Sequence, residues 1–163
     1  MASAGWSTCH FFRINGDFVP IDRFEGEIAD KDYVEGAIDC YVDGRPILTT
    51  HHWDLVDQLW AFIVDGLRTL DDGRDYEGYF PDQPLSLRFE SVSPDELNVS
   101  VGDESIAVDA MTFRLAIKNG AQEFFTKMMD VNPAASGTWE RYHKEAGLIG
   151  TPSCDDGWHG VTA

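Results

Sequence analysis

The stretch from His51 to Leu70 constrains the fold most, because its apolar residues recur at helical spacing over several turns. The residues that step by three or four along this stretch are Trp53, Val56, Trp60, Ile63, Leu67 and Leu70. Leu55, Leu59 and Phe62 widen the same stripe, and most of the polar residues fall outside it. The spacing therefore predicts an amphipathic core helix over 51–70, with Thr50 as its N-cap.

The residues before this helix predict four short strands, over 8–14, 17–24, 33–42 and 45–49. Asn15-Gly16 and Asp43-Gly44 separate two pairs of these strands, and such dipeptides readily take the positive φ angles of two-residue hairpin turns. In the third stretch every second residue, from Val34 to Val42, is apolar or small, which predicts a half-buried strand.

The residues after the core helix repeat this order of strands and helix. Gly73 predicts the end of the core helix, because glycine can take the left-handed conformation that satisfies the last carbonyl groups. Three short strands are then predicted, over 85–92, 97–101 and 105–108. Asp109 is expected to cap a second helix whose apolar stripe includes Phe113, Ile117, Phe124 and Met128.

Three further signals concern this second helix and the chain that follows it. Asn119-Gly120 is expected to break or kink the helix, and Pro133 is expected to end it. A short third helix is predicted over 137–147.

The order of these elements predicts an α+β fold, in which an antiparallel β-sheet of about six short strands in two groups is packed on one face by two long helices. A chain of 163 residues has the size of one domain, so residues 1–149 are predicted to form a single α+β domain. Residues 150–163 have turn formers and no periodicity, which predicts a loosely ordered C-terminal tail. The two halves could also be a degenerate duplication, although no residue-level repeat supports it.

The charge of the chain excludes several classes of partner. Twenty-nine Asp and Glu residues against twelve Lys and Arg residues give a formal charge of −17, which repels nucleic acid and anionic membranes. No apolar run approaches the roughly 20 residues that span a bilayer, and the N-terminus has no secretory signal, so a cytoplasmic location is expected. The acidity itself is open to two interpretations, a solvated surface or attraction of a basic partner.

Cysteine and histidine residues suggest no reactive or metal site. Cys9, Cys40 and Cys154 are far apart and odd in number, so we expect reduced thiols, with Cys9 and Cys40 buried in strands. His51 and His52 lie close to Asp54 and Asp57, but no third and fourth ligand has suitable spacing, so no metal is predicted.

The chain also lacks the motifs of common enzymes. It contains no GxSxG elbow, no Gly-rich phosphate loop and no HExxH, and DDGRDYEG lacks the aspartate alternation of a calcium loop. These absences favour a non-catalytic protein without a cofactor.

The acidic segment after the core helix provides the best candidate site. Asp71 and Asp72 would face the negative end of the helix dipole, so the helix itself does not account for them. The residues predicted to bind a basic protein partner are Asp71, Asp72, Asp75, Tyr76, Glu77 and Tyr79.

Two functional hypotheses follow from these observations. A small, acidic α+β protein without a catalytic motif resembles, in general type, the bacterial immunity proteins that neutralise basic toxin domains, and this implies an inhibitor that binds a basic protein. The alternative is a small-molecule-binding protein or enzyme with a pocket between sheet and helices, lined by Trp53 and Trp60.

Overall fold

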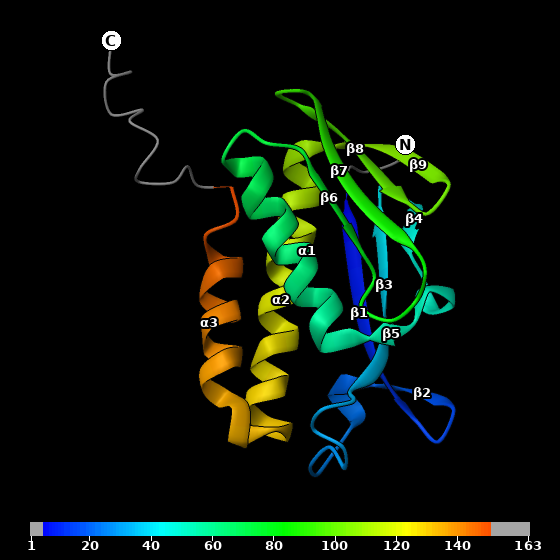
Figure 1. Cartoon of the computed structure of the whole chain (residues 1–163), viewed down its shortest axis with the longest axis vertical. Helices are drawn as coiled ribbons and strands as arrows, with labels where there is room; N and C mark the ends of the chain where they lie inside the picture. Colours follow the sequence, from blue (N-terminus) through cyan, green and yellow to red (C-terminus); the bar gives the residue numbers. More distant parts are fainter. Residues whose placement is uncertain (1–4, 151–163) are drawn as a thin grey trace.

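The computed structural model describes residues 5–150, and it confirms the predicted α+β class (Figure 1). The helices are α1 (Val56–Asp71), α2 (Ala110–Val131) and α3 (Ser136–Gly147). One sheet contains β1 (Trp6–Ile14), β2 (Asp17–Pro20), β3 (Glu35–Val42), β4 (Arg45–Leu48) and β5 (Asp54–Leu55). The other sheet contains β6 (Tyr76–Tyr79), β7 (Ser86–Ser93), β8 (Glu96–Val101) and β9 (Glu104–Asp109). The predicted tail lies outside the described residues, apart from Gly150.

The two groups of predicted strands form two separate antiparallel sheets. The order is β2-β1-β3-β4 in the first sheet, with β5 beside β3, and β6-β7-β8-β9 in the second. The helices lie together on one side of the molecule and the sheets on the other (Figure 1). Because the first sheet has a crossed strand order and the second is a simple meander, the two halves do not share one topology.

The turn chemistry read from the sequence sets both hairpins of the first sheet. Asn15 and Gly16 have φ angles of 52° and 85°, and Asp43 and Gly44 have 53° and 78°. Positive φ at both central residues is the signature of the type I′ turn, whose twist matches that of the flanking strands. The pairings on either side are therefore Ile14 with Asp17 and Val42 with Arg45.

The start of the core helix differs from its prediction. The helix begins at Val56, five residues later than expected, because the chain before it has other hydrogen bonds to make. Residues Thr50–His52 form a 3₁₀ turn capped by Thr49, and Asp54–Leu55 pair with β3. Thr50 is thus not the N-cap of the long helix, and the apolar stripe of 51–70 is divided between Trp53, β5 and α1.

The core of the fold is the contact between α1, α2 and the sheets. Trp60 of α1 is fully buried and packs against Phe124 of α2, with ring centroids 6.2 Å apart. Gly120 of α2 lies against the same indole, since a Cβ atom there would be 2.8 Å from Trp60 Cη2. The predicted break at Asn119-Gly120 is therefore wrong, because the glycine allows close helix packing inside a continuous helix.

The remaining helix boundaries agree with the sequence signals. Gly73 has a φ of 85° after the end of α1, and the Asp109 carboxylate accepts a hydrogen bond from the Thr112 amide at the start of α2. The second helix ends at Val131, two residues before Pro133. Within residues 5–150, none of the helices has the length and apolar character needed to cross a bilayer.

Candidate functional site

The six residues predicted to bind a partner lie on the end of α1, on the turn that follows, and on β6. Among residues 5–150 this strand pairs only with β7, so it forms one edge of the four-stranded sheet. In chain order the six are Asp71, Asp72, Asp75, Tyr76, Glu77 and Tyr79, and the structure places them in two different environments.

Asp71 belongs to the interior of the fold. Its side chain is 5% exposed, and its carboxylate accepts hydrogen bonds from Arg114 Nε at 3.0 Å and from the Gly150 amide at 2.7 Å. Arg68 Nη1 lies 3.5 Å from the other side of the same carboxylate. The charge of Asp71 is neutralised where α1, α2 and the chain after α3 meet, so it is not offered to a partner.

Asp72 and Asp75 lie on the turn between α1 and β6 and face solvent. Asp72 is 3.9 Å from Arg74, and these side chains are 39% and 71% exposed, so the ion pair is weak. Asp75 accepts a hydrogen bond from the Ser91 amide at 3.2 Å. This amide belongs to the part of β7 that extends past the first residue of β6, so the Asp75 side chain takes the place of a strand partner.

The residues of β6 alternate between the two faces of the sheet. Tyr76 points inward and stacks on Phe89 with ring centroids 5.7 Å apart, and both rings lie over Gly66 of α1. Burial raises the pKa of Tyr76, and the negative charge of Asp65 adds to that shift. Glu77 and Tyr79 point outward, and Tyr79 is 67% exposed.

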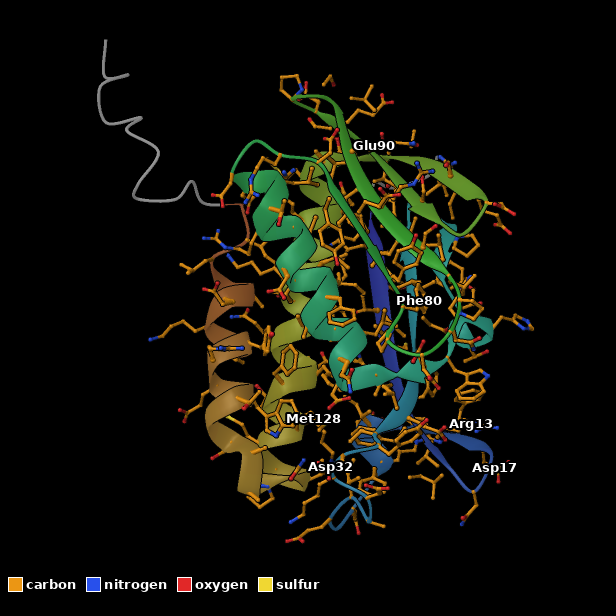
Figure 2. The ribbon with its side chains drawn as sticks, in the orientation of Figure 1. Arg13, Asp17, Asp32, Phe80, Glu90 and Met128 are labelled. Carbon is orange, nitrogen blue, oxygen red and sulfur yellow. The ribbon has the colours of Figure 1, made fainter. Side chains whose placement is uncertain are left out.

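Glu77 lies on the outer face of the four-stranded sheet, opposite the face on which Tyr76 and Phe89 pack over Gly66 of α1. Arg88 of β7 is opposite Glu77 in the register and is itself opposite Ser100 of β8. Glu90 lies further along β7 and Phe80 follows β6, so these two mark opposite ends of the β6–β7 pair (Figure 2). The strand registers place Glu77, Arg88, Glu90, Asn98 and Ser100 on this face, so it is polar.

A second cluster surrounds Asp54, which sequence reasoning considered only as a metal ligand. Asp54 is 1% exposed, and its carboxylate accepts hydrogen bonds from the amides of Asp82 at 3.0 Å and Gln83 at 2.9 Å. It therefore fastens the loop after β6 to the start of α1. No periodicity or motif in the sequence could have revealed this pairing across 28 residues.

The surface beside Asp54 is a small hollow of about 140 Å³, lined in part by Trp53 and Glu35. Arg13 stacks over the Trp53 ring at 4.1 Å and lies 3.3 Å from Glu35. The aromatic face of Trp53 is thus already occupied by a residue of the same chain.

The histidines near the start of α1 have structural surroundings. His52 Nδ1 accepts a hydrogen bond from the Thr49 amide at 3.1 Å, while His51 is exposed. Residues 5–150 bring no three His, Cys, Asp or Glu side chains together in a group that could hold a metal ion.

The predicted burial of two cysteines and the predicted pocket between two tryptophans are each only partly right. Cys40 is buried as expected, but Cys9 is exposed, because it lies on the outer face of β1 opposite Asp39 of β3. Trp60 is buried in the core, so only Trp53 of the two tryptophans reaches a hollow on the surface.

Comparison of the chain with protein-family models, with curated proteins and with solved structures gave no match in any of the three.

Proposed function

We propose that this protein is a non-catalytic binding module that neutralises a basic protein partner, in the manner of an inhibitor or immunity protein. The observation that carries the proposal is the grouping of four exposed residues at one edge of the four-stranded sheet. They are Asp72, Asp75, Glu77 and Tyr79. Asp71 and Tyr76 hold this edge in place from inside the fold and do not contact the partner.

Electrostatics supports this choice of partner. A formal charge of −17 attracts a basic protein from a distance and accelerates its association, especially at low salt. Asp72, Asp75 and Glu77 are close in sequence and face solvent, so they can concentrate that attraction at one place. Tyr79 adds an exposed aromatic ring, and tyrosine is enriched where protein interfaces bind strongly.

The small-molecule alternative loses support in its specific form, a pocket lined by Trp53 and Trp60. Trp60 and its neighbours fill the space between the helices and the sheets with buried side chains. The hollow that Trp53 lines has about 140 Å³, whereas pockets for small molecules commonly have about 300–1,000 Å³. Two larger surface hollows, of about 570 Å³ beside Asp71 and Arg114 and about 600 Å³ beside Ile21 and Glu123, lie away from the predicted Trp53–Trp60 pocket.

The test begins with affinity capture by the full chain from extracts of its own cells. The expected result is a protein of high isoelectric point, retained in a stoichiometric amount. Its association rate is then measured with the variant Asp72→Asn, Asp75→Asn, Glu77→Gln at two salt concentrations. We expect severalfold slower association and a weaker salt dependence, because steering depends on charges near the contact.

The matched control changes three exposed acids elsewhere by the same charge, as Glu25→Gln, Glu27→Gln and Asp30→Asn. This control should slow association much less. Equal slowing by both variants would mean that only diffuse net charge attracts the partner, and the β6 edge would lose its role.

A further inference from the structure

The hydrogen-bond pattern of β6 identifies which backbone groups face away from the sheet. In an antiparallel pair, alternate residues exchange hydrogen bonds with the neighbouring strand, and the residues between them point their amide and carbonyl groups the other way. The Phe80 amide donates to the Leu85 carbonyl at 2.8 Å, in the register that pairs Gly78 with Leu87 and Tyr76 with Phe89. Tyr76, Gly78 and Phe80 are therefore the residues bonded to β7.

A second contact gives the same assignment. The Ser86 carbonyl, opposite Tyr79, accepts a hydrogen bond from the Gly102 amide at 2.9 Å, so Ser86 bonds toward β8 and away from β6. The amide and carbonyl groups of Glu77 and Tyr79 must then point to the free edge. Outside the strand pairings, residues 5–150 provide no hydrogen bond to the backbone of either residue.

The other three edge strands each carry a proline or a side-chain hydrogen bond to the backbone, which β6 lacks in the described part of the chain. β2 ends at Pro20, β4 contains Pro46, and the carbonyl of Ala107 in β9 accepts a hydrogen bond from Arg45 Nη1 at 3.0 Å. Proline and charged side chains are common means of protecting sheet edges from pairing. β6 contains no proline, and proline follows only at Pro81.

The inner face of β6 is fixed, so the free edge is already shaped for pairing. Tyr76 is stacked on Phe89, and its hydroxyl end covers Gly78, where a Cβ atom would be 2.5 Å from the Tyr76 oxygen. A rigid edge lowers the conformational entropy lost when another strand binds.

We propose that the partner binds by adding an extended basic segment to β6 as a further antiparallel strand. This inference rests on the proposed function and specifies how the basic partner binds. Hydrogen bonds to Glu77 and Tyr79 would hold the segment, and a Lys or Arg side chain opposite Glu77 would form a cross-strand charge pair. A second copy of this chain suits the edge poorly, because each copy carries a charge of −17.

The probe for this mode is the synthetic peptide acetyl-KTKTKTKT-amide. A strand in the proposed register places its lysines opposite Glu77 and Tyr79, so their amides donate to β6. The control peptide has the same sequence and charge, but the backbone nitrogen of each of its four lysines carries a methyl group. We expect the N-methylated peptide to bind at least about tenfold more weakly, because it lacks these donors and its methyl groups block the edge.

Two protein variants provide an independent comparison. Tyr79→Pro removes one outward amide that no residue of the described chain uses, whereas Tyr79→Val keeps the amide and removes the ring. We expect Tyr79→Pro to weaken binding of the unmodified peptide at least about tenfold relative to Tyr79→Val. Hydrogen exchange should show the amides of Glu77 and Tyr79 fast in the free protein and slowed by the peptide, while the Gly78 amide is protected in both states.

Each contrary outcome has a distinct meaning. Equal affinity for the two peptides, or equal affinity of the two Tyr79 variants, would overturn strand addition and leave an electrostatic surface for a basic partner. No binding of the unmodified peptide at millimolar concentration would also overturn it. Self-association that Tyr79→Pro abolishes would show that a second copy occupies the edge. The proposed function fails separately, if the captured partner is not basic.

Discussion

The Asp71 carboxylate lies 3.0 Å from Arg114 Nε, and this contact joins the last turn of α1 to the first turns of α2. The same carboxylate accepts a hydrogen bond from the Gly150 amide. Helix α1, helix α2 and the chain after α3 therefore meet at one nearly buried acid. An aspartate at the C-terminal end of a helix opposes the helix dipole, but here two arginines compensate for it. The position of Asp71 is therefore explained by folding.

Replacement of Asp71 should reduce stability. In Asp71→Asn the two guanidinium groups lose their shared anion. We expect the free energy of unfolding to fall by about 1–3 kcal/mol, a moderate loss because both arginine side chains remain partly exposed to water. The control Asp72→Asn should change it by less than about 0.5 kcal/mol, because the Arg74 pair is exposed. Urea denaturation of both variants checks the difference, and equal effects would contradict the structural role of Asp71.

Replacement of Gly120 tests the contact between α1 and α2. Gly120→Ala places a methyl group against Trp60 and Thr8, and overpacking of this kind costs about 1–3 kcal/mol, which should exceed the helix-propensity gain of roughly 1 kcal/mol. Gly137→Ala in α3 meets nothing within 4 Å, so it should be neutral or slightly stabilising. Thermal unfolding should show a lower melting temperature for Gly120→Ala and an unchanged or slightly higher one for Gly137→Ala, and a stabilised Gly120→Ala would refute the close packing.

His10 should make stability depend on pH. Its side chain is 1% exposed among Trp60, Phe124 and Glu123, and burial lowers the pKa of His10 from 6.5 to about 4. Glu123 Oε1 is 3.3 Å from Nε2, but that carboxylate is 68% exposed and the contact lacks hydrogen-bond geometry, so desolvation dominates.

The sign of the effect follows from proton binding. Between pH 6.5 and 4 the unfolded chain binds a proton at His10 and the folded chain does not, so stability falls as the pH falls, by on the order of 3 kcal/mol in total. The unfolding free energy of His10→Leu should lack this contribution. Denaturation at pH 7, 5.5 and 4 measures the unfolding free energy of the wild type and of His10→Leu. If the two proteins lose stability equally as the pH falls, His10 is not the cause of the pH dependence.

The sequence predicted those parts of the fold that depend on neighbouring residues. Asn15-Gly16 and Asp43-Gly44 determine their turns locally, and Asp109 caps α2 within three residues of itself. The start of α1 was mispredicted because the pairing of Asp54–Leu55 with β3 is a contact between distant segments. Gly120 was misread for the same reason, since its role depends on Trp60 in another helix.

The candidate site was predictable to a smaller extent. Acid content drew attention to the segment from Asp71 to Tyr79, but composition could not separate the buried Asp71 from the exposed Glu77. That separation depends on Arg114, which lies 43 residues away in sequence. The free backbone groups of β6 likewise follow only from its register with β7.

Asp54 and Asp57 are three residues apart at the start of α1, and their carboxylates have opposite surroundings. Asp54 accepts hydrogen bonds from backbone amides of Leu55, Asp82 and Gln83, whereas Asp57 Oδ1 is buried with no hydrogen-bond partner in the described chain. Desolvation raises the pKa of Asp57 to about 6, although backbone hydrogen bonds from Gln58 and its own amide oppose the shift.

The same substitution at these two positions should therefore have opposite effects. Asp54→Asn places an amide NH₂ group against backbone donors, and we expect a loss of about 2–4 kcal/mol with faster hydrogen exchange at Asp82 and Gln83. Asp57→Asn removes a charge that burial disfavours. Because burial raises the pKa of Asp57 in the folded protein, ionisation of this carboxylate lowers the stability as the pH rises from about 4 to 6. Asp57→Asn should therefore stabilise the protein by about 1–2 kcal/mol at pH 8 and change its stability little at pH 4. Denaturation of both variants at the two pH values checks the contrast. Destabilisation by Asp57→Asn at pH 8 would mean that the backbone hydrogen bonds from Gln58 and Asp57 outweigh the cost of desolvation.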